Sequence, residues 1–362
     1  MNDELNWIYS LKEEVVDFLR HQASLNREGY YSYSYSGDLY SDNTHWNVGS
    51  SVFALRCYYS LGIEKNNQIK SALNYINSFR VDSLIYDKFI FKKTFFRNIA
   101  VSIKNNDLSN LLNYKYKNAE TRQCLSALLM YDSLPNNIKL DIPLGEKSVS
   151  YYLNSLNWNE PWGAGSHFSH LMFFYKVALR TGQIDNNEYH KNIGYAINWI
   201  NSIQSKSTGG WYTGTPKQRN IINGAMKIIT GLISVDINEI EFSKQLIDTC
   251  LMSANDEHAC DNFNIILVLY FLNKQMKSSY RYNEIKLFSF DRLIKYKAHY
   301  KKDKGGFSFY PYHSNTRYYG ARITSGLNEP DLHGTFLFLY GISLIAEILE
   351  INETLGFKIY AS

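Results

Sequence analysis

The sequence predicts an all-α protein in which two kinds of helix alternate along the chain. Helices of the first kind are apolar on one face only. Helices of the second kind are apolar nearly all round, so they must be buried on every side. Six segments of the second kind recur about every 60 residues, with about six one-sided helices between them. Repeated helical hairpins stack into a solenoid or close into a ring, and six pairs predict an (α/α)6 toroid.

The one-sided helices are recognised by apolar residues spaced three and four apart. In residues 7–19 these are Trp7, Leu11, Val15 and Phe18, with acidic and basic residues mostly on the other face. The same spacing recurs in residues 69–79 and 193–203. This spacing places the apolar residues on one side of an α-helix, so we expect these helices to form the outer layer.

The helices that we expect inside end on glycine in two cases, Gly62 and Gly182, as a left-handed helix cap favours. Two glycine- and tyrosine-rich loops, residues 209–216 and 305–323, precede inner helices and are expected to contain little more than a short hairpin. No linker rich in Pro, Gly or Ser divides the chain, so we expect one domain, 1–362. The inner segments are residues 46–62, 124–134, 167–182, 223–235, 261–272 and 333–349.

Composition narrows the function classes. The net charge is only +4 and no long run of like charges occurs, which argues against nucleic acid as the partner. The four cysteines form no CxxC pair. The N-terminus lacks the pattern of a signal peptide, and no apolar run reaches about 18 residues, so we expect a soluble cytoplasmic protein without a transmembrane segment.

Polar residues gather at the beginnings of the inner segments, which in a toroid meet at one mouth. The positive ends of the helix dipoles would meet there too, and a concave polar site with aromatic walls is the usual place for a ligand. Each residue also has a purely structural interpretation: Asn and Asp are preferred helix caps, the tryptophans fit a core, and a histidine pair three residues apart is more often a hydrogen-bonded core pair than a metal site. The candidates are His45, Trp46, Arg122, Trp162, His167, His170, Asn223, Asp261 and His333.

A second set of candidates lies in the loop that precedes the last inner segment. Tyr318 and Tyr319 carry phenol groups that can move a proton, and Arg317 and Arg322 can pair with acidic groups. The same residues fit a solvated flap, so the sequence leaves both interpretations open.

Two stretches near the C-terminus carry a family resemblance. The "GGF" loop followed by "DLHGTFLFLYGISLI" resembles the repeat of protein prenyltransferase β-subunits and squalene-type cyclases, and "HACDNFNIILVLYFL" is similar to their preceding inner helix. The resemblance implies zinc held by Cys260 and His333 with Asp261 or His258, and for a prenyltransferase a partner α-subunit. The chain lacks the DxDD acid motif of the cyclases and their Gln-Trp repeats, so cyclisation by protonation is not expected.

The toroid architecture is also shared by uronate lyases, unsaturated-uronyl hydrolases and sugar epimerases. The expected mouth is rich in Asn, His, Arg and Tyr, which suit hydroxyl- and carboxylate-bearing rings, so we expect an enzyme that acts on a small or oligomeric carbohydrate containing uronate. His167, His333 and Asn223 would orient the sugar, Tyr318 or Tyr319 would move the proton, and Arg122 or Arg322 would pair with acid groups.

The reaction would be elimination or hydrolysis. Hydrolysis would need two carboxylates, for which Glu257, Asp261 and Asp331 are the candidates. The alternatives are a zinc-dependent prenyltransferase-like or terpenoid-cyclase-like enzyme and a non-catalytic binding scaffold.

Overall fold

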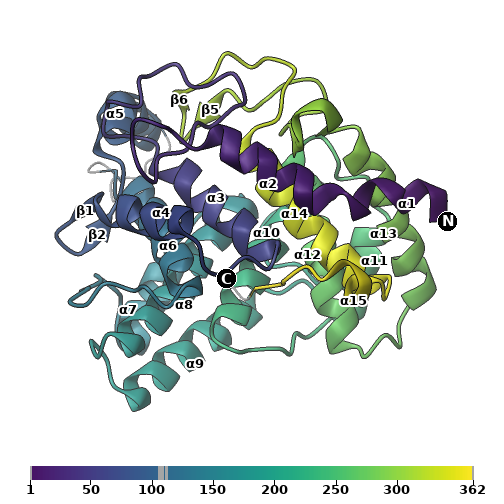
Figure 1. The fold of residues 1–362 in the computed structure, drawn as a ribbon. Coiled ribbons are helices and arrows are strands. Elements are labelled where there is room, and N and C mark those ends of the chain that lie inside the picture. The colour runs from purple at the N-terminus through teal and green to yellow at the C-terminus, as the bar shows by residue number, and fades with distance from the viewer. Residues whose placement is uncertain (1, 105–109, 111–112, 361–362) are drawn as a thin grey trace.

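The computed structural model describes residues 2–104, 110 and 113–360, and it confirms the all-α class (Figure 1). The helices that are buried on nearly all sides are α3 (Val48–Ser60), α6 (Tyr114–Met130), α8 (Pro161–Arg180), α10 (Gln218–Ser234), α12 (Ala259–Gln275) and α14 (Leu332–Ile348). The others are α1 (Asn2–Tyr9), α2 (Leu11–Gln22), α4 (Asn67–Asn77), α5 (Lys88–Lys104), α7 (Glu146–Asn154), α9 (Asn186–Ser202), α11 (Ser243–Leu251), α13 (Tyr282–Lys297) and α15 (Asn352–Leu355). Short antiparallel pairs join β1 (Arg80–Val81) to β2 (Leu84–Ile85), β3 (Tyr300–Lys301) to β4 (Gly306–Phe307), and β5 (Arg317–Tyr318) to β6 (Ala321–Arg322).

The six buried helices contact one another in a closed cycle. Each packs against the next in chain order, from α3 through α6, α8, α10 and α12 to α14, and α14 returns to pack against α3. One-sided helices cover this ring from outside: α4 lies on α3, α9 on α8, α11 on α12, and α13 on α12 and α14. Because the ring helices are covered on both sides, their apolar surface is buried all round, as the sequence pattern requires.

Glycines let two ring helices approach closely. A Cβ atom on Gly224 of α10 would lie 2.9 Å from the carbonyl carbon and oxygen of Pro161 in α8, and one on Gly231 would lie 3.0 Å from the Cα of Ser169. A Cβ on Gly165 of α8 would in turn lie 2.9 Å from the carbonyl oxygen of Gly224. The absence of side chains at these positions therefore fixes the distance between α8 and α10.

Several helix boundaries differ from the sequence expectation. The N-terminal helix divides at Ser10 into α1 and α2. The ring helix expected from Cys124 begins at Tyr114, that expected from His167 begins at Pro161, and that expected from Asn223 begins at Gln218. The first turns of α6 and α10 carry charged and polar residues, and that of α8 contains Pro161 and Gly163, so a run of apolar residues does not mark where these helices begin.

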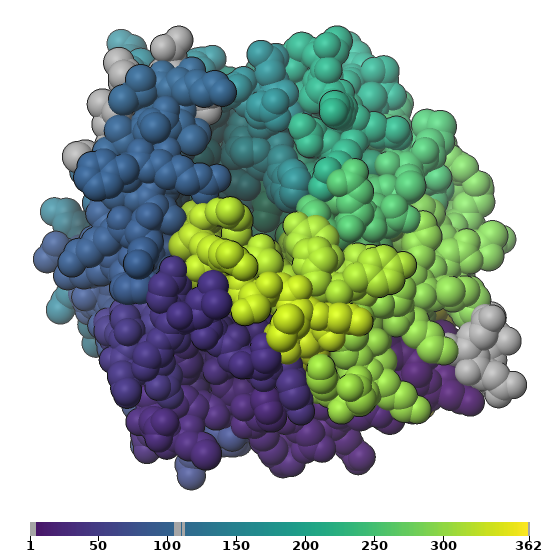
Figure 2. Space-filling view, turned by 90° about the horizontal axis from the view of Figure 1, so that it is seen from above, coloured from purple at the N-terminus to yellow at the C-terminus, as the bar shows by residue number. Residues whose placement is uncertain are grey.

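The β5–β6 hairpin covers the end of the ring where the inner helices begin. Tyr318 packs against Phe53 of α3, and the Tyr319 ring meets the Tyr116 ring of α6 at 4.9 Å. The loop also reaches α14, because the backbone N–H of Asn315 donates to the capping carboxylate of Asp331. Figure 2 shows this segment in yellow-green at the centre of the face. The mouth expected from the sequence is thus largely closed by the loop.

The helices carry no membrane-crossing signature: none in the described ranges is both long and apolar enough to span a bilayer.

Candidate functional site

A pocket of about 550 Å³ opens beside the hairpin, between α5, α6 and α8; we call it the α6–α8 pocket. Figure 2 shows the recess between the blue segment of α5, the teal segment of α8 and the yellow-green hairpin. Its lining joins residues that are far apart in the sequence and includes Arg97, Ser102, Tyr116, Ala119, His167, His170 and Tyr319. Three sequence candidates, His167, His170 and Tyr319, therefore share one pocket.

The two histidines of this pocket lie in the second and third turns of α8. Their rings meet edge to face with centroids 5.7 Å apart. Burial lowers the pKa of His170 well below its usual value, and the charges of His167, Arg122 and Lys227 lower it further. His170 is therefore neutral at physiological pH, and its buried Nδ1 has no hydrogen-bond partner among the described residues. A neutral imidazole of this kind can accept a proton or a hydrogen bond from a ligand.

Tyr318 ends strand β5 and Tyr319 begins the turn of the hairpin, and their ring centroids lie 4.6 Å apart. Tyr319 is half-buried and lines the pocket, whereas Tyr318 is buried and its hydroxyl has no hydrogen-bond partner in the described part of the chain. Burial and the nearby Glu120 raise the pKa of both phenols. Both phenols are therefore protonated at neutral pH, which suits donation of a hydrogen bond or proton rather than its removal.

Glu120 lies beneath the hairpin and is fully buried. Its Oε2 accepts hydrogen bonds from the Tyr116 hydroxyl and, at 2.7 Å, from the backbone N–H of Asp87. Burial and the neighbouring Asp87 raise the pKa of Glu120 to about 8. Glu120 lies in the second turn of α6 and carries a proton at neutral pH.

Arg122 lies two residues after Glu120 on α6 and is also buried. Its guanidinium lies over the Phe173 ring at 5.3 Å and contacts the Ser169 hydroxyl of α8 at 3.4 Å. Two further cations on ring helices, Arg56 and Lys227, affect the pKa values of groups around it. Sequence reasoning missed both, although each is a lone charge in a segment apolar all round, and that pattern is the signal that identifies them.

Asp261 belongs to a separate polar network between α10 and α12. Its fully buried carboxylate forms an ion pair with Arg219 at 2.8 Å and accepts a hydrogen bond from Asn223 at 2.8 Å. Arg219 also contacts Nε2 of His258 at 2.9 Å and lies over the Trp162 ring at 5.9 Å. Asn223 and Trp162 therefore lie with this network rather than in the α6–α8 pocket.

The zinc set implied by the family resemblance does not fit this arrangement. The described residues contain no group of three or more His, Cys, Asp or Glu side chains placed to hold a metal. The carboxylate of Asp261 is already paired with Arg219, and burial raises the pKa of the Cys260 thiol to about 12, so the site favours the neutral thiol over the thiolate that zinc binds. No step of the chemistry below uses zinc.

His333 stands in the first turn of α14, inside the ring. Its ring stacks on Phe53 at 4.5 Å, and its buried Nδ1 is without a partner among the residues the structure describes. Burial and the charges of Lys227, His258 and Arg56 lower the pKa of His333 to about 3. It is thus a second neutral imidazole, next to the cations rather than to a metal.

The remaining candidates lie away from the pocket. His45 is exposed and stacks on Phe79, and Trp46 is fully buried in the core with its Nε1 bonded to a backbone carbonyl. Arg317 and Arg322 are exposed on the hairpin strands. The structure brings none of these four side chains to the α6–α8 pocket.

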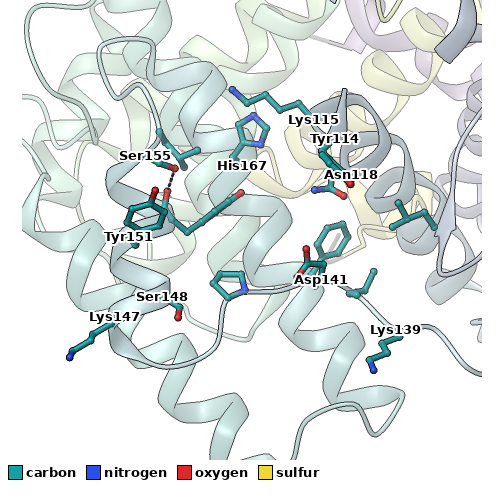
Figure 3. Close-up of a pocket in the computed structure, with 16 residues that line it drawn as sticks. Tyr114, Lys115, Asn118, Lys139, Asp141, Lys147, Ser148, Tyr151, Ser155 and His167 are labelled. Atoms are coloured by element: carbon teal, nitrogen blue, oxygen red, sulfur yellow. Dashed lines mark hydrogen bonds between the residues drawn. The ribbon is translucent and has the colours of Figure 1, made fainter. Parts of the chain in front are cut away.

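A larger cleft of about 950 Å³ lies on the side of the molecule, between α6, α7 and α8. Figure 3 shows Lys115 and His167 next to each other at one edge of this cleft and Asp141 across from them. Lys115 and His167 border both this cleft and the α6–α8 pocket, so the two hollows meet at these two side chains.

No family model, curated protein or solved structure matches this chain.

Proposed function

We propose that the closed cycle of ring helices is an (α/α)6 toroid and that the protein is an enzyme acting on an acidic, uronate-containing carbohydrate. The observation that carries the proposal is the meeting of His167, His170 and Tyr319 in one pocket, close enough to the buried Arg122 for its charge to lower the pKa of His170. A neutral base, a phenol and a cation are the three groups that elimination from a uronate requires.

The geometry favours elimination over hydrolysis. Hydrolysis needs a free carboxylate pair, but Asp261 is ion-paired and Asp331 accepts three backbone N–H bonds as the cap of α14. In elimination, Arg122 would neutralise the sugar carboxylate and so acidify the C5 proton. His170 would take that proton, and Tyr319 would give its own to the leaving oxygen at C4, so that a C4–C5 double bond forms.

The test is an assay of acidic oligosaccharides for the ultraviolet absorbance of the unsaturated product. Tyr319→Phe and His170→Gln are each expected to lower kcat by roughly 100-fold or more. Tyr312→Phe is the matched control, because Tyr312 belongs to the same loop but is 81% exposed. Equal activity of the two Phe variants, or no unsaturated product from any acidic saccharide, would refute the proposal.

One observation favours a second candidate, an isoprenoid enzyme. Aromatic rings stack in series from α3 to the C-terminal segment: Phe53 on Phe336 at 5.7 Å, and Tyr340 on Tyr360 at 4.2 Å. Such a wall suits a hydrocarbon chain. Turnover of isoprenoid diphosphates, with acidic saccharides unchanged, would select this candidate.

A further inference from the structure

Four neighbouring ring helices each place a nitrogen-bearing side chain at the same depth. Arg56, Arg122, His170 and Lys227 all lie in the third turn of their helices, α3, α6, α8 and α10. These helices are consecutive in the contact cycle. The four side chains therefore form one layer inside the ring, which we call the basic layer.

The arginines of the basic layer are buried without an acidic partner. Arg56 is 5% exposed and Arg122 is 9% exposed, and Nε of each is buried with no hydrogen-bond partner in the described part of the chain. Their closest polar contacts are long: Arg56 to the Ser126 hydroxyl at 3.5 Å and Arg122 to the Ser169 hydroxyl at 3.4 Å. Arg56 also lies over the Phe336 ring at 5.1 Å.

The cations are close enough to repel one another. Burial and then the charge of Arg56 lower the pKa of Arg122 to about 10. Burial, together with the charges of Arg122 and Arg56 and against the opposing effect of Cys260, lowers the pKa of Lys227 to about 8. Burying like charges together without a counter-charge is costly, and proteins retain such an arrangement where a ligand supplies the missing charge.

The nearby carboxyl groups do not supply a counter-charge to the three cations of the basic layer. Asp261 is neutralised by Arg219, Asp331 is occupied by backbone N–H groups, and Glu120 is protonated at neutral pH. No salt bridge among the described residues includes Arg56, Arg122 or Lys227. Among the described residues, the basic layer thus lacks a counter-charge, which a bound anion can supply.

We propose that the basic layer binds the phosphate group of a phosphorylated organic substrate, held between Arg56, Arg122 and Lys227. A single carboxylate would offset only one of the three cations, whereas a phosphate monoester brings nearly two negative charges and several acceptor oxygens. The unpartnered guanidinium nitrogens provide the planar donors that phosphate oxygens fit. The organic part would extend past His170 into the α6–α8 pocket.

This inference deepens the proposed function, because it adds a phosphate group to the acidic sugar. It rests on the proposed function in one respect: both place the ligand inside the ring. Binding is measured without turnover, so the two proposals fail separately: an absence of elimination leaves phosphate binding intact, and an absence of phosphate binding leaves the elimination assay intact.

The experiment compares thermal stability and calorimetric affinity with inorganic phosphate and with glucuronate for the wild type, Arg122→Gln, Lys227→Met and Arg56→Gln. Phosphate is expected to bind the wild type more tightly than glucuronate does, and each variant is expected to weaken phosphate binding about 10- to 100-fold. Without phosphate, the variants are expected to melt at a higher temperature than the wild type, because an uncompensated buried charge is gone.

The matched control is Lys274→Met, which removes a lysine from ring helix α12 at the opposite end of the ring and should leave phosphate binding unchanged. The inference is overturned if phosphate binds Arg122→Gln, Lys227→Met and Arg56→Gln as tightly as it binds the wild type. It is also overturned if glucuronate binds as tightly as phosphate. If one substitution prevents folding, the other two still decide the matter.

Discussion

The backbone N–H of Asp87 donates a hydrogen bond to Oε2 of Glu120 across 2.7 Å, so two buried carboxyl groups belong to one network. The Asp87 carboxylate itself accepts hydrogen bonds from the backbone N–H groups of Asn47, Phe89 and Ile90. Asp87 thereby links the beginnings of α3 and α5 to the second turn of α6. The network supports one wall of the α6–α8 pocket.

This relationship predicts a pH-dependent stability. The pKa of Glu120 is about 8 in the folded protein, above its ordinary 4.5, so the folded state keeps a proton that the unfolded state loses between these pH values. The free energy of unfolding should therefore fall as pH rises from about 5 to 8. Glu120→Gln cannot ionise, so its loss over this range should be smaller than that of the wild type by roughly 2–4 kcal/mol.

Urea unfolding at pH 5 and pH 8 measures this difference. Asp87, whose pKa is raised to about 6, stays in both proteins and contributes equally to both slopes. Parallel pH profiles for the wild type and Glu120→Gln would show that Glu120 is ionised in the fold.

A glycine substitution should separate α8 from α10. In Gly224→Ala the new Cβ would lie 2.8 Å from the Pro161 Cβ, so one helix must shift, at a cost of roughly 1–3 kcal/mol. Gly194→Ala in the outer helix α9 is the matched control, since nothing lies within 4 Å of its Cβ position. That control should stabilise the protein by roughly 0.4–1 kcal/mol. Thermal unfolding of both variants distinguishes tight helix contact from ordinary helix propensity, and equal effects would contradict the packing.

Removing the partner of Asp261 should be costly. Arg219→Gln leaves a fully buried carboxylate without its cation, and we expect a loss of roughly 2–3 kcal/mol, reduced from the value for a fully buried pair because Arg219 is partly exposed. Asp261→Asn added to Arg219→Gln should recover part of the loss. Arg20→Gln, which breaks an exposed pair with Asp17, should cost roughly 0.5 kcal/mol or less. The expectation fails if Arg219→Gln is as mild as Arg20→Gln in denaturant titrations.

Metal analysis should separate the network from a zinc centre. Because Asp261 is bound to Arg219 and Cys260 is a neutral thiol, Cys260→Ser should leave the metal content of the purified protein unchanged. Elemental analysis after dialysis measures this. Stoichiometric zinc that disappears in Cys260→Ser would contradict the ion-pair arrangement and favour the prenyltransferase-like alternative.

The sequence predicts which helices are buried and which lie outside, but it does not predict that the β5–β6 hairpin covers the end of the ring where the inner helices begin. Segments apolar all round, such as that around Phe338, predicted the buried helices, because the apolar pattern records burial directly. The burial of Tyr318, in strand β5 of the hairpin, depends on its contact with Phe53, which no local pattern encodes. The division of the polar residues between two places, with His170 in the pocket and Asp261 in the network, depends on how neighbouring helices are rotated.

The sequence contains a signal for two members of the basic layer. Arg56 and Lys227 are single charges within segments that otherwise have no polar face. Charged side chains are rarely buried unless they are paired or serve a functional site. The criterion of polar residues at helix beginnings selects Asn223 but not Lys227, which lies one turn further along the same helix.

The presence of a ligand site inside the ring is tested most directly by a crystal structure of the protein grown with tungstate, a phosphate analogue with strong anomalous scattering. We predict one strong anomalous peak within contact distance of Arg56, Arg122 and Lys227. Peaks confined to exposed lysines such as Lys139 and Lys147, with the ring interior empty, would contradict the proposed site.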